Sequence, residues 1–427
     1  MTRFRPVALG TAAFAVVLTA AITGGALIAQ QKPASGPIAR YDMRAGTVTG
    51  VGAMGRGAGA GMAMVFGGGG GGNAAQHELY LRLGSSRPAD NGTPRADHFM
   101  PPPAKLGKSV PLITPRVETG PIDEIPGDRK PTGRLLIFWG CGEHAPKGQP
   151  VIIDFARLAA GQMPPGLWSS TILRDWGPTL TNSKTFGRWP NEDTMGGNRQ
   201  IRPDASLIGA HRIAGNYAPE INFALARDFM AGLRATNTTL PSGAATVKWN
   251  AVPEATGYFA SLFGGKRGPN DQMGDMVMWS SSALRQFGGG LSDWLSPGQV
   301  APLVANRTVL SPATTACTVP AEVRAAAPDF RVGTLTAYGP QEDFAYPPRP
   351  ASAATPWKLE WTARIRHRSL TSWMDIPGMP PGYGGAMDDG DGSSGNNGQQ
   401  KPKCKPRGGL LGGLGGLGGV LGGGGGC

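Results

Sequence analysis

The stretch TVKWNAVPEATGYFASLF, residues 246–263, decides the fold of this chain. Val247 and Trp249 alternate with polar neighbours, which places both apolar side chains on one face of a strand. Residues 250–257 contain asparagine, proline and glycine, the residue types that form turns. Residues 258–263 are rich in aromatic and aliphatic side chains and resume the alternation. The stretch therefore predicts two successive strands joined by a turn.

A short motif in this stretch indicates a known family. Trp249 is followed by Pro253, Ala255, Thr256, Gly257 and Tyr258. The motif resembles the B and C strands of a fibronectin type III domain, in which the tryptophan fills the core between two sheets and the tyrosine begins the neighbouring strand. The resemblance implies a fibronectin-like β-sandwich over residues 244–376.

One feature departs from the family. A fibronectin type III domain usually carries a proline-glycine pair followed shortly by a tyrosine that locks a corner. Here Pro297 and Gly298 are followed by Gln299, Val300 and Ala301. We therefore expect the later strands of this sandwich to be rearranged.

The composition is that of folded domains between low-complexity segments. The chain has 427 residues, which is room for two domains, and it contains 10 tryptophans. Its 68 glycines and 39 prolines make up about a quarter of the chain, but the glycines gather in a few tracts. We expect a globular interior flanked by glycine-rich segments.

Short strand patterns also precede the opening stretch. Residues 77–83 alternate leucines with other side chains, as a half-buried strand does. Residues 134–139 (RLLIFW) and 151–155 (VIIDF) have the pattern of a buried strand and its partner across a loop. Such short strands, without a long amphipathic helix, predict sandwiches or barrels.

The predicted closing strand of the second domain, residues 357–368, has two distinct faces. Trp361 and Ile365 face the core, whereas Arg364 and Arg366 lie on the opposite, solvent-facing side. Further strands are expected at residues 171–176, 206–213, 275–280 and 331–338, and residues 221–233 suit a strand or a short helix, of which we favour the strand.

Together these patterns predict an all-β fold with two β-sandwich domains between disordered glycine-rich segments. Linkers are assigned where glycine or polar threonine-rich sequence replaces strand patterning. The expected divisions are a signal peptide or N-terminal anchor at 1–31, a glycine-rich linker at 32–75, a first β-sandwich at 76–234, a linker at 235–243, a fibronectin type III-like domain at 244–376 and a tail at 377–427.

Residues 1–31 have the character of an export signal. Arg3 and Arg5 precede an uncharged run over residues 6–31, with alanines suited to cleavage near its end. The run is long for a signal peptide, so an uncleaved membrane anchor is the alternative. In either case we expect the protein to be exported, and to be periplasmic, on the cell surface or secreted.

The net positive charge of the chain limits the classes of partner that we expect. The net charge of +12 comes from 41 basic and 29 acidic residues, scattered except for the basic run at 401–407. Nucleic-acid binding needs a localised patch, so we do not expect that partner. Attraction to an anionic envelope surface is the milder consequence. Membrane contact is expected only through an uncleaved N-terminal segment or weak association of the leucine-bearing tail at 408–427.

Four cysteines, Cys141, Cys317, Cys404 and Cys427, are available for disulfides in an exported protein. Three connectivities are possible. One of them links Cys141 to Cys317 between the domains and Cys404 to Cys427 within the tail, and the alternative is that some are free. None has the CxxC spacing of a zinc or redox motif.

The densest group of reactive side chains is Cys141, Glu143 and His144, with Asp154 on the next predicted strand. A nucleophile, a base and an orienting acid are all present in kind. No recognisable nucleophile context surrounds them, so a loop disulfide with a polar cluster is the favoured interpretation.

Trp168, Trp176 and Trp189 lie among charged residues in a loop-rich part of the first domain. Flat aromatic rings on a β-sandwich can stack on sugars, and Glu143 and His144 are additional candidates for ligand binding. The alternative interpretation of the tryptophans is ordinary core packing.

We expect neither a metal nor another cofactor. The acidic cluster at residues 388–391 lacks the spacing and distal glutamate of a calcium loop, and the five histidines are dispersed. The sequence favours a non-enzymatic envelope or secreted protein that binds an envelope polymer or a protein partner or has a structural role. The alternative is a glycan-binding or glycan-active enzyme or accessory that uses the first domain. Structural assembly through the glycine-rich tails is a third possibility.

Overall fold

The computed structural model of the chain describes residues 36–54, 75–116, 133–162, 173, 177–191, 200–268, 273–286, 290–352 and 355–376. Strands dominate these residues, and the predicted all-β class is confirmed. The helices are α2 (Phe155–Ala159), α3 (Pro297–Ala305) and α4 (Ala321–Ala326), with 3₁₀ turns η1 (Val51–Met54) and η2 (Pro102–Ala104). None of the described helices is both long and apolar enough to cross a membrane. The predicted export segment and the tail lie outside the described residues.

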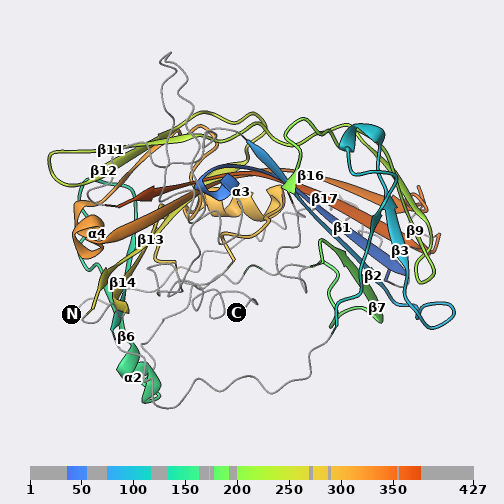
Figure 1. The fold of residues 1–427 in the computed structure, drawn as a ribbon, viewed down its shortest axis with the longest axis horizontal. Coiled ribbons are helices and arrows are strands. Elements are labelled where there is room, and N and C mark those ends of the chain that lie inside the picture. Colours follow the sequence, from blue (N-terminus) through green and yellow to red (C-terminus); the bar gives the residue numbers. More distant parts are fainter. Residues whose placement is uncertain are drawn as a thin grey trace, which may run out of the picture.

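A ten-stranded sheet runs through the whole molecule (Figure 1). In spatial order its strands are β6 (Val151–Asp154), β5 (Arg134–Trp139), β14 (Met273–Ser280), β13 (Gly257–Arg267), β16 (Phe330–Tyr346), β17 (Trp361–Asp375), β1 (Ala39–Gly50), β2 (Gln76–Ser85) and β7 (Thr185–Trp189), and β8 (Gln200–Ile201) also pairs with β2. Neighbouring strands are antiparallel except for the pairs β1–β17 and β5–β14, which are parallel.

Two smaller sheets cover opposite halves of the large one. The first has the order β10 (Ile221–Leu225), β9 (Gly209–Gly215), β3 (Ala96–Phe99) and β4 (Val110–Pro111), and the second has the order β11 (Ala235–Thr239), β12 (Ala245–Trp249) and β15 (Ala316–Val319). They lie toward opposite ends of the large sheet in Figure 1. We call the half under the four-stranded sheet the first sandwich and the other half the second sandwich.

Each half has its own apolar core. In the first sandwich, Met43 and Leu81 of the large sheet pack with Ile213 and Phe223 of the small sheet. This core forms because side chains alternate between the two faces of each strand, so every second residue turns inward. The result is a layer of apolar side chains between two sheets, which is the packing of a β-sandwich.

The second sandwich is built around the strand–turn–strand stretch at residues 246–263. Trp249 of β12 and Tyr258 of β13 are buried in one core with Trp279, and the rings of Trp249 and Tyr258 are 5.6 Å apart. The Tyr258 hydroxyl accepts a hydrogen bond from the Val252 amide at 2.9 Å, which fixes the turn between the two strands. The predicted strand–turn–strand unit is present, and its two aromatic residues are core residues.

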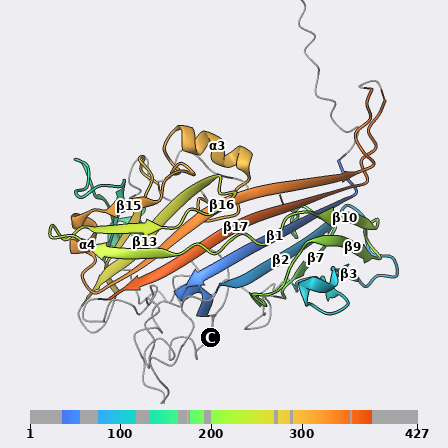
Figure 2. The ribbon, with the colours of Figure 1, turned by 90° about the horizontal axis from the view of Figure 1, so that it is seen from above.

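Two long strands join the halves. Figure 2 shows β16, β17 and β1 side by side along the length of the molecule. Trp361 and Ile365, near the start of β17, belong to the first core, whereas Trp373 near its end belongs to the second. The predicted inward orientation of Trp361 and Ile365 is confirmed, but they pack in the core of the first sandwich and not, as was expected, in that of the second domain. The strand begins at Trp361, four residues later than expected, and continues to Asp375.

The predicted solvent-facing side of β17 is wrong at Arg366, whose side chain is only 3% exposed. Asp42 of β1 accepts hydrogen bonds from Arg366 Nη2 at 2.9 Å, Arg364 Nε at 3.1 Å and Arg44 Nε at 3.0 Å. Arg366 also donates to the Trp294 carbonyl, in the segment that leads into α3. Ion pairing and this covering segment explain why an arginine lies buried on the outer face.

The glycine-rich linker predicted at 32–75 is partly wrong, because residues 39–50 form β1 in the middle of the large sheet. Tyr41 and Met43 alternate with polar neighbours and turn into the first core. A Cβ on Gly46 would lie 2.7 Å from the side chain of Glu78 and 3.0 Å from Trp294. Glycine is required at this point of the strand by close packing, not by flexibility.

The division into two consecutive domains also differs from the structure. Residues 134–154, assigned to the first domain, form β5 and β6 at the edge of the large sheet beside β14. Residues 235–239 of the predicted linker form β11. Parallel pairing of β5 with β14 joins segments far apart in the chain, and short-range patterns carry no information about such pairing.

One further expectation needs correction, and the departure from the family pattern at Pro297 has a structural reason. Residues 221–225 form a strand as favoured, but residues 226–234 leave it to cross between the small sheets, where Thr47 donates a 2.6 Å hydrogen bond to the Met230 carbonyl. Pro297 begins helix α3, with Ser296 and Gln299 forming a capping box, so no strand corner exists there. The strand expected at 171–176 falls almost wholly outside the described residues.

Candidate functional site

The candidate nucleophile Cys141 forms a disulfide bond and is therefore not a free thiol. Its partner is Cys317 of β15, at an S–S distance of 2.07 Å and a Cα–Cα distance of 5.2 Å. The bond ties the loop after β5 to the three-stranded sheet, so both cysteines belong to the second sandwich. It does not link two consecutive domains. Cys404 and Cys427 lie outside the described residues.

The polar residues around Cys141 have structural contacts. His144 Nδ1 lies 3.1 Å from Glu322 Oε1 of α4, and Glu322 also accepts a hydrogen bond from the Ala145 amide at 2.9 Å. That amide, more than the histidine, lowers the pKa of Glu322. Glu143 is exposed and its carbonyl accepts from the Ala321 amide at 3.0 Å. These contacts dock the loop on α4.

Asp154, the candidate orienting acid, is a helix cap. Its Oδ1 accepts hydrogen bonds from the Ala156 and Arg157 amides at 2.9 and 3.2 Å, at the start of α2. The loop residues and Asp154 thus each serve local structure, and with Cys141 oxidised they offer no nucleophile.

Of the three candidate tryptophans, only Trp189 is described. It lies on β7 opposite Leu81 of β2 and packs, half-buried, against the first core. This contact agrees with the packing interpretation. Trp168 and Trp176 lie outside the described residues. Across the part of the chain that the structure describes, no group of three histidine, cysteine or acidic residues is placed to hold a metal ion.

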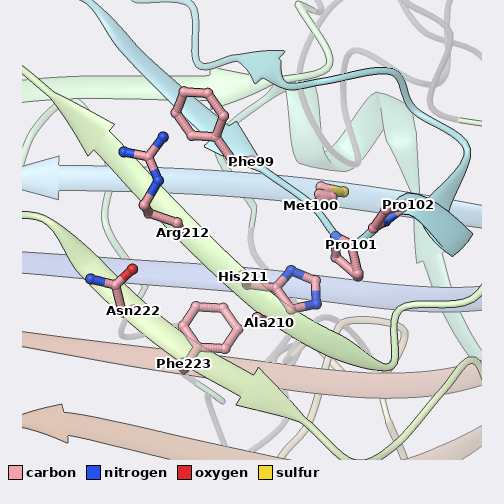
Figure 3. A pocket seen from close by; sticks show the side chains of 9 residues that line it. All are labelled: Phe99, Met100, Pro101, Pro102, Ala210, His211, Arg212, Asn222 and Phe223. Carbon is pink, nitrogen blue, oxygen red and sulfur yellow. The ribbon is translucent and has the colours of Figure 1, made fainter.

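An open groove lies on the four-stranded sheet of the first sandwich (Figure 3). Its volume is about 600 Å³, and its walls include Phe99, Pro101, Arg212, Asn222 and Phe223. Figure 3 shows Phe99 and Arg212 on one side of it and Pro101 and Pro102 on another. Most of the side chains come from three adjacent strands, β3, β9 and β10, which the sheet holds in register, whereas Pro101 and Pro102 come from the segment that leads from β3 into η2.

The polar rim of the groove is held by a small network. The Arg212 guanidinium lies 3.9 Å from the centre of the Phe99 ring, a cation–π contact. Arg212 Nη1 donates to Glu220 Oε2 at 3.2 Å, and Asn222 Nδ2 donates to Glu220 Oε1 at 2.9 Å. The hydrogen bonds from Asn222 and then Arg212 lower the pKa of Glu220. The rim therefore offers oriented donors beside an apolar wall.

A buried polar chain lies beneath the groove. Tyr41 Oη is 2.7 Å from His98 Nδ1, His98 Nε2 is 2.9 Å from His211 Nδ1, and His211 Nε2 is 2.7 Å from the Leu207 carbonyl oxygen. The chain runs from β1 in the large sheet to β3 and β9 in the small one. It therefore connects the two layers of the first sandwich.

Burial sets the ionisation of this chain. It lowers the pKa of His98 well below its usual range, an effect that the neighbouring His211 reinforces. Burial also lowers the pKa of His211, which its hydrogen bond to Leu207 and the Glu342 carboxylate partly offset. Burial, with the charge of Asp42, raises the pKa of Tyr41. All three side chains are therefore neutral near pH 7.

His98 and His211 were not predicted as site residues, because the five histidines are dispersed in the sequence. His98 and His211 are 113 residues apart in the chain, so only strand pairing brings them together. Each histidine occupies an inward position of a short strand in which inward and outward residues alternate. In β9, the next inward residue after His211 is the apolar Ile213. A polar residue at an inward strand position was the signal in the sequence that could have pointed to these buried histidines.

The residues that line the groove are mostly apolar, with His211, Arg212 and Asn222 as the polar members. Of the residues that line it, none is a serine, cysteine, lysine or carboxylate, and both ring nitrogens of His211 are occupied by hydrogen bonds. Comparison with known protein families, with curated proteins and with solved structures gives no match for this chain. The groove is therefore interpreted from its own geometry.

Proposed function

We propose that the protein is an exported, non-enzymatic envelope or secreted protein that binds its partner through the groove on the first sandwich. The observation that carries the proposal is the groove itself. It combines an apolar wall around Phe99 and Pro101 with a polar rim of Arg212 and Asn222, and its lining has no serine, cysteine, lysine or carboxylate side chain. An apolar surface with a few oriented polar groups is the usual composition of a binding site.

Two features support export. The Cys141–Cys317 disulfide belongs in an oxidising compartment, since thiols are kept reduced in the cytosol. Residues 1–31 have the charge and apolar pattern of an export signal. The periplasm, the cell surface and the medium all fit these two features.

The second sandwich fits a fibronectin type III-like scaffold. Strands β11, β12 and β15 form one sheet, and β14, β13, β16 and β17 are consecutive in the other. Three strands facing four is the count of a constant-type immunoglobulin sandwich, and β5, whose Phe138 lies in the same core, extends the larger sheet beyond that count. Trp249 between the sheets and Tyr258 at the start of the next strand agree with the family pattern. Such a fold hosts many functions, so it supports a scaffold role and no particular ligand.

An envelope glycan is the second candidate for the partner class, beside a protein segment. The Arg212–Glu220–Asn222 network places donors and an acceptor next to an aromatic ring, which is a common arrangement around bound sugars. Of the two carboxylates considered for the glycan-active alternative, Glu143 lies in the loop docked on α4 and Asp154 caps helix α2.

Binding is tested on the full chain with arrays of envelope glycans and of peptides from envelope proteins. Replacing Arg212 by alanine should weaken binding about tenfold or more, since a charge-assisted hydrogen bond would be lost. Phe99→Ala should also weaken it. Lys248→Ala, exposed on β12 of the other sandwich, is the matched control. Equal binding by all three variants, or turnover of any arrayed glycan, would contradict the proposal.

Export is tested separately. Protein from its native cells should fractionate outside the cytoplasm and carry the Cys141–Cys317 cross-link in a non-reducing peptide map. Free thiols at both positions in the native protein would argue for a reducing compartment and against export.

A further inference from the structure

The buried polar chain has a fixed direction. The Leu207 carbonyl can only accept, so His211 must donate from Nε2 and accept at Nδ1. His98 must then donate from Nε2 and accept at Nδ1, where the Tyr41 hydroxyl donates. One arrangement of protons therefore satisfies every bond, and in it both histidines are neutral Nε2–H tautomers.

An added proton cannot be accommodated without loss. A proton on His211 Nδ1 meets the N–H of His98, so His98 must move its own proton to Nδ1. The Tyr41 hydroxyl then has to accept, and its hydrogen loses its acceptor inside the core. A buried cation and an unpaired hydroxyl result, and both are costly in an apolar interior. His98 and Tyr41 are 0% and 2% exposed, so water cannot supply the missing partner.

The charged groups around the chain offset this cost only in part. Glu342 of β16 acts on His211, but it also lies 3.6 Å from the buried His367 of β17. The charge that acts on His98 is that of His211, which opposes protonation. Asp42, next to Tyr41 in β1, has its side chain on the opposite face of the sheet. The residue of β10 that contacts the buried polar chain is the uncharged Phe223, whose ring stacks on that of His211 with the ring centres 5.2 Å apart.

The buried polar chain of Tyr41, His98 and His211 is confined to one half of the molecule. It links β1 of the large sheet to β3 and β9 of the four-stranded sheet. The described core of the second sandwich contains no histidine, and the histidine near it, His144, is exposed. Protonation of His98 and His211 in mildly acidic solution therefore acts on the closure of the first sandwich, beside the half-buried His77 of β2, whose pKa burial also lowers.

We propose that the buried polar chain is a pH-sensitive latch, which holds the four-stranded sheet on the large sheet near neutral pH and releases it in mild acid. The proposal stands on the hydrogen-bond geometry and does not depend on what the groove binds. Release would also alter the groove, because Phe223, which lines it, packs against Tyr41 of β1 and Phe344 of β16 in the large sheet.

The direction of the pH effect follows from the histidines. Their pKa values are lowered in the closed state, so the open state takes up protons first, starting near the ordinary histidine pKa of about 6.5. The latch is therefore fully effective above about pH 6.5, and it weakens as the pH falls below that value. Each histidine that must become charged contributes up to about tenfold in the opening equilibrium per pH unit.

Amide hydrogen exchange on the full-length protein tests the latch. The measured quantity is the protection of β3, β9 and β10 relative to β12 and β15, which removes the intrinsic pH dependence of exchange. Between about pH 7.5 and about pH 5 this ratio should fall at least about tenfold. At the higher pH, the ¹⁵N shifts of His98 and His211 should be those of neutral Nε2–H rings. An unchanged ratio, or a charged ring at the higher pH, would overturn the proposal.

Variants assign the effect to the chain. The triple variant Tyr41→Phe/His98→Leu/His211→Leu should keep its protection ratio constant over this pH range. His144→Gln, at an exposed histidine of the second sandwich, should retain the full acid response. His77→Gln, at a half-buried histidine of β2 stacked on Phe229, measures the separate share of that residue, whose pKa burial also lowers. If the triple variant does not fold, the single variant His98→Asn should reduce the acid response. An acid response lost in His77→Gln but kept in the chain variants would assign the switch elsewhere and overturn the latch.

Discussion

The two sandwiches share one sheet but are closed in different ways. In the first, a chain of neutral polar groups, Tyr41, His98 and His211, crosses between the layers. In the second, an apolar core around Trp249 is reinforced by the Cys141–Cys317 disulfide. The comparison teaches that halves of one continuous sheet can respond to different conditions. The first half depends on proton concentration, and the second on packing and oxidation.

Continuity of the large sheet limits how independent the halves can be. β16 and β17 contribute to both cores, and at roughly 3.3 Å per residue strands of this length span about 50 Å. The small sheets contribute to one core each. A defect in a small sheet should therefore stay within its own half, whereas a defect in β16 or β17 should reach both.

The largest expected effect is in the second core. Trp249→Ala should lower the free energy of unfolding of the second sandwich by about 3–5 kcal/mol, because it leaves a large cavity. Urea unfolding gives the total loss, and hydrogen exchange locates it. Protection should fall in β11, β12 and β15 and remain in β3 and β9. Equal loss in both small sheets would show that the halves unfold as one unit.

Trp249→Phe is the matched control for that change. The indole nitrogen of Trp249 is buried without a hydrogen-bond partner among the described residues, so phenylalanine sacrifices volume and no hydrogen bond. The loss should be well below that of the alanine variant. A loss as large as that of Trp249→Ala would mean that the indole nitrogen has a partner after all.

A smaller but still substantial effect is expected at the ion cluster beside the first sandwich. Asp42→Asn would leave the buried Arg44 and Arg366 without their shared carboxylate, a change that typically costs about 3 kcal/mol or more. Glu220→Gln, which removes the exposed partner of Arg212, should change stability little. Thermal melting compares the two variants. A harmless Asp42→Asn would indicate that the covering segment, and not the charge, stabilises this face.

Which residues form the two cores can largely be predicted from the sequence, because the period-two alternation of each strand shows which of its faces is apolar. Trp249 and Tyr258 were predicted as core residues, and they are 6% and 0% exposed. The inward face of the strand around Trp361 and Ile365 was also predicted. Local alternation sets which side chains turn inward, and turn residues set where a strand stops, so both can be inferred from short windows.

The rest depends on which strands pair, and short windows do not contain that information. Residues 39–50 looked like a glycine-rich tether because their partners, β17 and β2, are supplied from elsewhere in the chain. The groove and the buried polar chain have the same origin. His98, His211 and Tyr41 come from three strands and acquire their shared role only after the sheets have assembled.

The smallest expected effect is at His144, in the loop that the sequence singled out for possible chemistry. Its side chain is 70% exposed and its partner Glu322 is 45% exposed, so the ion pair is well solvated. Glu322 keeps its hydrogen bond from the Ala145 amide when the imidazole is removed. His144→Ala should therefore change the free energy of unfolding by no more than about 0.5 kcal/mol. Urea unfolding measures this, and binding by the groove, which lies on the first sandwich, should be unaffected. A large loss of stability, or any loss of binding, would give the loop a role beyond docking on α4 and would reopen the second sandwich as the place to look for function.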